Sequence, residues 1–324
     1  MYINQHPSII VSWIQDALYQ GKPINSYQPA HQPEEQLKQN GIVYRNDIAY
    51  AHQYPNSYLD ISYPDPHRFA NRPTIIYFHG GGYFGGDKAM GDPLAENNNA
   101  NALFNDLVQH GYNVVNVNYA LVPEYRFPVP LIQMNQAINF LSAHSSEYDL
   151  NMNNVIIMGS SAGAILTSQY GALLSNSQYA DSMNIHPQLT TQQVKALVID
   201  DAPLQTATLN WGTGVLIRNY LGTNDLMNSK QAQQYNPLLH LTTRYPPSFL
   251  TAANTGGFPD DMSAFSAQLT SYGIDNEYFY LDPSHGNIPH GFLANIQTDA
   301  HAQACLVQLL EFIDKYTKLT SASL

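Results

Sequence analysis

Strand-like and helix-like segments alternate through most of this chain, and the alternation restricts the folds it can adopt. Apolar runs predict strands at 74–78, 113–118, 155–158, 196–199, 248–253 and 276–281, with two more strands within 41–63. Helical periodicity predicts helices at 8–19, 101–110, 131–143, from the corner after 155–158 to about residue 175, 260–272 and 299–318. Strands separated by helices pair in parallel through right-handed crossovers. The sequence therefore predicts an α/β fold with a mostly parallel central sheet flanked by helices.

We expect one domain over residues 1–324, because 324 residues suit a single large α/β domain with insertions. The core is expected at about 41–201 and 246–318. The segments 1–40 and 202–245 are polar or less regular, and we expect them to form a small cap over the functional edge of the sheet.

Composition argues against several classes of partner. The formal net charge is −12 and no Lys/Arg cluster offsets it, which disfavours nucleic acid and anionic membrane surfaces. No run approaches the ~20 apolar residues of a membrane span, and the first 20 residues lack a signal-peptide pattern. The single cysteine, Cys305, cannot form an internal disulfide and is expected in the core. We therefore expect a soluble cytoplasmic protein, and a homodimer stays open.

A glycine-flanked serine follows the predicted strand 155–158, in the sequence "VIIMGSSAGAILTSQYG". In a G-x-S-x-G corner the serine occupies a tight strand-to-helix turn that holds its Oγ clear of the sheet. The residues two positions before and after the serine must be small because backbone and neighbouring elements crowd them, and here they are Gly159 and Gly163. Ser161 is therefore the candidate nucleophile, and Ser160, one residue early, is the competing serine.

A second glycine motif follows the predicted strand 74–78, in "HGGGYFGGDKAMGDP". Consecutive glycines let backbone N–H groups face one point without obstruction by side chains. The N–H groups of Gly81, Gly82 and Ala162 would make a three-donor oxyanion hole. Phosphate binding is the rival interpretation, but Lys88 lies between an aspartate and an alanine, and no glycine-rich helix start follows, so neither nucleotide motif fits.

The order of the motifs resembles the hormone-sensitive-lipase-like esterase group of α/β-hydrolases, over roughly residues 70–315. The resemblance is carried by "HGGG", "NYALVPEYRFPVPLIQ" at 118–133, G-x-S-x-G and "HGF" at 290–292. In the second element Tyr119 to Glu124 and the pair Phe127-Pro128 replace the group's usual "Y-R-L-A-P-E" and "F-P".

The resemblance implies an α/β-hydrolase fold and a serine esterase, often for short acyl chains, without a metal or organic cofactor. By carry-over, Ser161 is the nucleophile, and Gly81, Gly82 and Ala162 supply the oxyanion hole. His79 is expected to shape the glycine loop rather than to exchange protons.

A serine nucleophile needs a general base within hydrogen-bond reach. The loop after the last predicted strand, "LDPSHGNIPHGFLAN", offers His285 and His290. His290 matches the family's "H-G-F", so it is the preferred base and His285 is the alternative.

The acid of the triad is where the sequence departs from the family. The family's aspartate follows the strand after a Pro-Pro pair, and that slot falls on Gly256. Asp260 is the preferred substitute because a glycine-containing loop leaves the register uncertain by a few residues. Asp261 is an alternative, as are Asp201 and Asp200 at the end of the preceding strand, and the absence of any acid is left open.

These residues support two hypotheses of different classes. The first is a carboxylesterase that cleaves small or short-acyl esters through an acyl-enzyme, with an amidase as a variant of the same mechanism. The second is a catalytically impaired hydrolase-fold protein that binds a small ligand, which the glycine at 256 motivates. Tyr83, Phe84 and Trp211 are candidates to line a substrate pocket, and few aromatics in 202–245 disfavour a lipid-binding lid.

Overall fold

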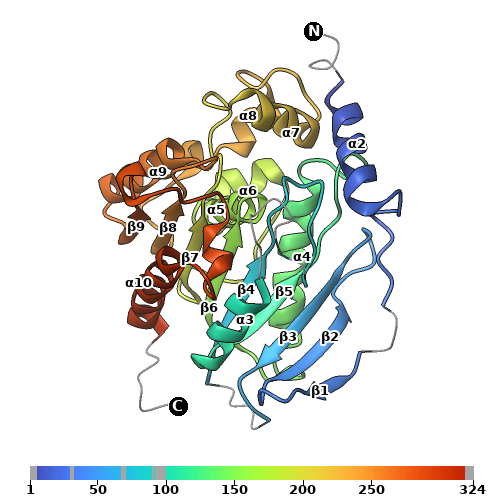
Figure 1. The fold of residues 1–324 in the computed structure, drawn as a ribbon, viewed down its shortest axis with the longest axis vertical. Coiled ribbons are helices and arrows are strands. Elements are labelled where there is room, and N and C mark those ends of the chain that lie inside the picture. Colours follow the sequence, from blue (N-terminus) through green and yellow to red (C-terminus); the bar gives the residue numbers. More distant parts are fainter. Residues whose placement is uncertain (1–5, 30–32, 67–70, 90, 92–99, 318–324) are drawn as a thin grey trace.

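The computed structural model describes residues 6–29, 33–66, 71–89, 91 and 100–317, and within them nine strands form one sheet (Figure 1). The spatial order is β1-β2-β3-β5-β4-β6-β7-β8-β9. The strand bounds are β1 Glu35–Leu37, β2 Val43–Ala49, β3 Tyr58–Tyr63, β4 Pro73–Phe78, β5 Asn113–Val117, β6 Asn151–Ser160, β7 Val194–Asp200, β8 Ser248–Ala252 and β9 Asn276–Tyr280.

The sheet is antiparallel at one edge and parallel elsewhere. β1, β2, β3 and β5 pair antiparallel in that order. From β5 through β4, β6, β7 and β8 to β9 every pairing is parallel. The mostly parallel sheet expected from the alternating segments is therefore confirmed.

Helices cover both faces of the sheet. Their bounds are α2 Pro7–Tyr19, α3 Ala100–Gln109, α4 Val129–Ala143, α5 Ala162–Ser175, α6 Ser177–Met183, α7 Trp211–Leu221, α8 Lys230–Tyr235, α9 Pro259–Ser271 and α10 Ala300–Thr317, with short 3-10 turns η1 Pro237–His240, η2 Pro283–His285 and η3 Phe292–Asn295. One apolar cluster joins the sheet to α4, α5 and α9. A second joins the opposite face to α3 and α10, and it includes the buried Cys305, as expected.

Part of the segments expected to form the cap packs together outside the sheet, and part belongs to the sheet. Helix α2 packs against α7, and Figure 1 shows α7 and α8 at the top of the molecule. In contrast, β1 belongs to the sheet, because it pairs with β2 although it lies within 1–40. Residues 1–5 and 30–32 of the expected cap lie outside the described residues.

The central strands bring their carboxyl ends to one level, which fixes where a site can form. β4 and β5 are buried along their whole length, as is typical of parallel strands covered on both faces. At the ends of β6, β7 and β8, Ser160 pairs with Asp200 and Asp200 pairs with Thr251. In open α/β sheets, ligands bind in the crevice outside these carboxyl ends.

Candidate active site

Ser161 occupies a strained corner between β6 and α5. Its backbone has φ 53° and ψ −115°, a combination that a residue with a side chain rarely adopts. Its N–H donates to the carbonyl of Asp200 at 2.8 Å, which ties the corner to β7. The side chain is held at the helix N-terminus and is 6% exposed.

The corner can form only because two glycines leave room for it. A Cβ on Gly159 would lie 2.2 Å from the carbonyl oxygen of Gly163, and a Cβ on Gly163 would lie 1.9 Å from the carbonyl oxygen of Phe78. Both contacts involve backbone atoms, which cannot rotate away. The crowding predicted for these two positions is confirmed.

His290 is the histidine that the fold brings to Ser161. Its Nε2 lies 2.9 Å from Ser161 Oγ. The loop that carries it is fixed from the end of β8, because the His290 N–H donates to the carbonyl of Thr255 at 3.0 Å. His285 is exposed and lies 3.7 Å from Asp282, on its own turn. The structure therefore brings His290 and not His285 to the serine.

The carboxylate beside His290 comes from the residue that follows β7, not from α9. Asp201 Oδ2 lies 2.6 Å from His290 Nδ1, and the Asp201 side chain is fully buried. The expectation that Asp260 fills this position is wrong, because Asp260 is exposed in the first turn of α9. Asp261 is buried, but its carboxylate accepts hydrogen bonds from Gln205 and Thr208 instead.

Two glycines explain why Asp201 fits where the family's aspartate is missing. A Cβ on Gly256 would meet His290 Cβ at 4.0 Å, so residue 256 does lie beside the base. A Cβ on Gly257 would lie 2.6 Å from Asp201 Oδ2, so the carboxylate occupies the space above that glycine. The other oxygen, Oδ1, accepts the N–H of Phe258 at 2.8 Å. The carboxylate beside His290 is therefore supplied from the end of β7 and not from the loop after β8.

Asp200 is adjacent to Asp201 in the sequence, but its side chain bonds to Thr251 rather than to His290. Its Oδ1 accepts a hydrogen bond from Thr251 Oγ1 at 2.6 Å. Burial raises the pKa of Asp200 to about 6, although hydrogen bonds from Thr251 and Ser160 oppose the shift. Successive strand residues point to opposite faces, so Asp200 braces the ends of β7 and β8 from the α10 side of the sheet.

The glycine loop presents unpaired N–H groups near Ser161. Gly81 and Gly82 have φ 100° and 57°, values that favour glycine. No backbone hydrogen bond among the described residues uses the N–H of Gly81, Gly82 or Ala162. Gly82 and Ala162 line the same cavity as Ser161, whereas Gly81 does not line it. This arrangement is suited to hold a negative oxygen.

His79 supports the glycine loop from below. Its ring stacks on Tyr119 at 4.2 Å between centroids, and its Nδ1 lies 2.8 Å from the carbonyl oxygen of Gly80. Burial lowers the pKa of His79 to about 4, so the imidazole is neutral near pH 7. These contacts agree with a role in shaping the loop.

Helix α2 also holds this loop, which sequence analysis did not anticipate. The buried Gln15 amide donates to the carbonyls of Phe84 at 3.0 Å and Val122 at 2.6 Å. Tyr19 accepts the N–H of Gly86 at 2.9 Å. In the sequence, the sign of this contact is Gln15, a polar residue on the buried face of a helix whose other buried residue is Val11.

A cavity of about 150 Å³ opens over Ser161. It is lined by Gly82, Tyr83, Ser161, Ala162, Ile165, Pro203, Thr213, Leu216, Ile217, Gly256, Phe258 and His290. Of the three aromatic candidates, Tyr83 lines it, Phe84 is buried behind the loop, and Trp211 is exposed and does not line it. The cavity is therefore apolar apart from the reacting groups, Tyr83 and Thr213.

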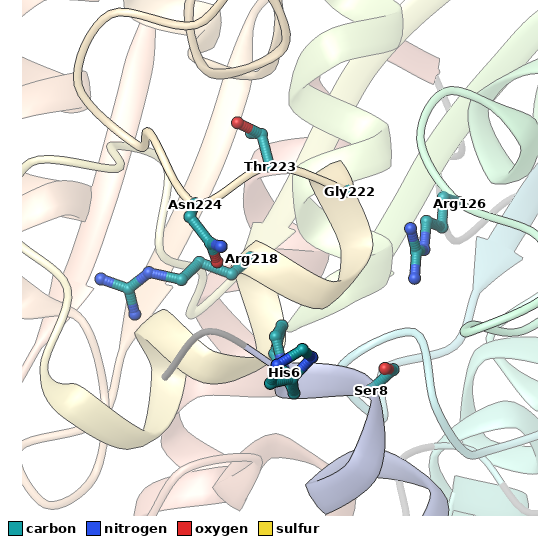
Figure 2. Close-up of a pocket in the computed structure, with 8 residues that line it drawn as sticks. His6, Ser8, Arg126, Arg218, Gly222, Thr223 and Asn224 are labelled. Atoms are coloured by element: carbon teal, nitrogen blue, oxygen red, sulfur yellow. The ribbon is translucent and has the colours of Figure 1, made fainter. Parts of the chain in front are cut away.

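A second cavity, of about 220 Å³, lies between the start of α2 and the end of α7 (Figure 2). Arg126 and Arg218 line it, and Figure 2 shows their guanidinium groups on opposite sides of His6. Arg126 lies over Gly222, whereas Arg218 folds back toward Gly214. The two positive charges do not converge, so the cavity lacks the paired cations that typically hold an anion.

The comparisons with known proteins agree with this architecture. A model of the BD-FAE family matches residues 59–256, more than half of the chain. The chain belongs to the BD-FAE family. The matched part contains the glycine loop, Ser161 and Asp201, and it ends before His290.

Two relatives of this BD-FAE member are named as esterases. An esterase of Gibberella moniliformis is 24% identical over 222 residues, which are 63% of this chain and 63% of that protein. Esterase LipI of Mycobacterium tuberculosis is 24% identical over 213 residues, 64% of this chain and 63% of that protein. The chain thus spans less than two thirds of the length of these relatives.

Solved structures extend the similarity to nearly the whole fold. Esterase B from Lactobacillus Rhamnosis has a TM-score of 0.76 at 17% identity, covering 98% of this chain and 97% of that chain. An esterase from the bacterial hormone-sensitive lipase family has a TM-score of 0.61 at 20% identity, covering 94% and 90%. The predicted α/β-hydrolase fold is confirmed.

Two further observations concern the residues that the structure describes. Among them no helix is both long and apolar enough to cross a membrane. The same residues contain no cluster of three or more His, Cys, Asp or Glu side chains suited to a metal ion.

Proposed function

We propose that this BD-FAE member is a serine carboxylesterase. The observation that carries the proposal is the continuous chain of contacts from Ser161 Oγ to His290 Nε2 at 2.9 Å and from His290 Nδ1 to Asp201 Oδ2 at 2.6 Å. A hydroxyl, an imidazole and a buried carboxylate in this order are the parts of a nucleophile activated by a general base.

Each residue then has one role. Ser161 Oγ attacks the acyl carbonyl while His290 Nε2 takes its proton. Asp201 holds the Nδ1–H tautomer and stabilises the imidazolium. The N–H groups of Gly81, Gly82 and Ala162 stabilise the oxyanion, and each such donor typically contributes about 3 kcal/mol to transition-state stabilisation.

The rest of the cycle uses the same groups. His290 gives its proton to the departing alcohol, which leaves the acyl group on Ser161. Water then attacks the acyl carbon while His290 takes one of its protons. The resulting tetrahedral intermediate collapses, the bond to Ser161 Oγ breaks, and His290 returns the proton to Ser161 Oγ as the acid is released. No step needs a cofactor, since His290 passes on each proton that it takes up, first to the alcohol and then to Ser161.

The alternative hypothesis, a catalytically impaired protein that binds a small ligand, is no longer supported by the residue that motivated it. It rested on Gly256 in the slot of the acid, and Asp201 offers a carboxylate to the same imidazole. Esters are proposed over amides because the relatives of this chain bear esterase names. A reducing compartment such as the cytoplasm is proposed because the one cysteine, Cys305, is free.

Ester turnover tests the proposal directly. We expect the purified protein to hydrolyse p-nitrophenyl acetate and butyrate and to be labelled by a fluorophosphonate at Ser161, located by peptide mass spectrometry. Turnover with labelling at another residue would contradict the assigned nucleophile. Reversible binding of a labelled ester without hydrolysis would favour the ligand-binding alternative.

A change at Gln15 tests whether α2 positions the oxyanion loop. Gln15→Leu removes the donors to the carbonyls of Phe84 and Val122. Leaving buried carbonyls unpaired costs about 1–3 kcal/mol, and small displacements of reacting groups slow catalysis by up to about 100-fold. We expect kcat to fall at least about tenfold with KM little changed.

The control for this change is Gln109→Leu, at the exposed end of α3. It should leave kcat unchanged. If Gln15→Leu lowers the melting temperature but not kcat, α2 stabilises the fold without positioning the loop.

A further inference from the structure

A stacked pair of tyrosines joins the glycine loop to helix α7. The rings of Tyr83 and Tyr220 are nearly parallel, with 8° between their planes, and their centroids are 3.5 Å apart. Tyr83 follows Gly82 directly, and Tyr220 lies in the last turn of α7. Both side chains are completely buried. The residue next to a proposed oxyanion donor is therefore held by an element that is distant in the sequence.

Tyr83 needs such support because its backbone is strained. Its φ is 64°, in the left-handed region that a residue with a side chain rarely adopts. It lies in a tight turn, since the N–H groups of Phe84 and Gly85 both donate to the carbonyl of Gly81, at 3.0 and 3.1 Å. Its own carbonyl accepts the N–H of Val122 at 2.9 Å. A strained conformation persists only where the surrounding structure determines it, and the stack on α7 does so through the side chain.

Tyr220 is itself held by its neighbours. Its carbonyl accepts the N–H of Phe127 at 2.9 Å, and the Phe127 ring packs perpendicular to its ring, with the centroids 5.7 Å apart. The ring of Tyr235 contacts it at 6.4 Å, and the Tyr235 hydroxyl donates to the carbonyl of Pro203 at 2.5 Å. The stack thus connects the glycine loop to a well-packed group of side chains.

The rings, rather than the hydroxyls, make the contact between Tyr83 and Tyr220. Burial raises the pKa of Tyr83, and the nearby Tyr220 raises it further, so the two hydroxyls lie near each other. Even so, neither hydroxyl makes a hydrogen bond of ordinary geometry with any residue that the structure describes. Tyr220→Phe would therefore keep the stack and remove a buried hydroxyl whose hydrogen-bonding capacity is unused.

Helix α7 contacts the glycine loop a second time, one turn before Tyr220. Leu216 Cδ1 lies 3.1 Å from the position that a Cβ on Gly82 would take. Leu216 and Tyr220 are four residues apart, so they lie on the same face of α7. Leu216 packs against Gly82 itself, while Tyr220 holds the residue that follows it. The part of the loop that carries the Gly82 N–H is thus fixed from α7.

We propose that the Tyr83–Tyr220 stack positions the oxyanion hole, because it holds the turn that directs the N–H of Gly82. Tyr220 does not line the cavity over Ser161, so it is a positioning residue and not a catalytic one. The inference rests on the proposed esterase function and adds a residue on which the rate depends. It gives α7 a role in the chemical step beyond forming one wall of the cavity.

Tyr220→Leu tests the inference because it removes the planar ring that supports Tyr83. We expect kcat for p-nitrophenyl acetate to fall at least about tenfold with KM within about twofold, since small displacements of reacting groups slow catalysis. A trifluoromethyl ketone, whose adduct with Ser161 carries a negative oxygen, should bind more weakly by a similar factor. Tyr220→Phe should keep kcat and inhibitor affinity within about twofold of the unmodified enzyme, because the stack remains.

The matched control is Tyr179→Leu, the same truncation at another buried helical tyrosine. Tyr179 lies in α6, and its ring stacks on His240 at 4.0 Å. Both Leu variants should melt at a lower temperature, because each leaves unfilled space in the core. Only Tyr220→Leu should lose kcat and inhibitor affinity. If Tyr220→Leu does not fold, Tyr220→Met gives the same comparison, since methionine fills the space with a flexible side chain that has no planar face.

The outcomes separate this inference from the proposed function. Unchanged kcat and inhibitor affinity in the folded Leu or Met variant of Tyr220 would overturn the inference and leave the esterase intact. An equal loss in Tyr179→Leu, or a loss in Tyr220→Phe as large as that in Tyr220→Leu, would also overturn it. Absence of turnover and of fluorophosphonate labelling in the unmodified protein would refute the esterase and, with it, this role of Tyr220.

Discussion

Ser161→Ala should lower kcat for p-nitrophenyl acetate by about 10⁵–10⁶-fold, because it removes the hydroxyl that lies 2.9 Å from His290 Nε2. His290→Ala should have an effect of the same size. The double variant should be no worse than either single one, since residues that act as a unit are not additive. Steady-state rates, with active-site titration to exclude traces of unmodified enzyme, measure this.

Two nearby residues serve as matched controls for that result. Ser160→Ala removes the competing hydroxyl one position away, and His285→Ala removes the competing imidazole from the same loop. Both variants should stay within about tenfold of the original kcat. A collapse of activity in His285→Ala with activity kept in His290→Ala would refute the assigned base.

Asp201→Asn should reduce kcat by about 10⁴-fold while the fold is retained, because an amide leaves the histidine in the wrong tautomer. The substitution keeps the shape of the side chain in its buried space above Gly257. The decisive comparison is Asp260→Asn, which should be close to the original enzyme because Asp260 is exposed. Circular dichroism and thermal melting of both variants check that they fold.

The pair of variants also distinguishes the alternatives left open by the sequence. A large loss in Asp260→Asn with none in Asp201→Asn would mean that the loop after β8 rearranges to bring α9 to the base. Equal and small effects of both would mean that the enzyme works without an acid partner for His290.

The pattern of apolar segments was enough to predict the fold and its most local features. Strand β6 ends and helix α5 begins on either side of the glycine-flanked serine, as its motif requires. The crowding at Gly159 and Gly163 was predictable because it follows from the conformation of a few neighbouring residues. The boundaries of most strands and helices differ from prediction by one to four residues. Strand β1 and helices α6, α7 and α8 were missed. β1, α6 and α8 have three, seven and six residues, which carry little periodicity, and α7 lies in the stretch expected to be less regular.

The features that sequence analysis missed or left open depend on contacts between distant segments. His290 and Asp201 are 89 residues apart, and Gln15 lies 69 residues from Phe84. Counting residues from the Pro-Pro pair located the acid's usual slot at Gly256, but it could not show that the end of β7 faces the same imidazole. The parallel register of Ser160 with Asp200 was the physical link, and it becomes visible only once the strands are paired.

The loop after β8, which contains Gly256, also holds the loop that carries His290. Asn254 and Thr255 both donate their N–H groups to the carbonyl of Ile288, and Thr255 accepts the N–H of His290. Asn254 Oδ1 also accepts the N–H of Ile288 at 2.9 Å. Several hydrogen bonds therefore join the two loops, and a chimera built from a relative must exchange both loops together, or His290 loses the contacts that hold it.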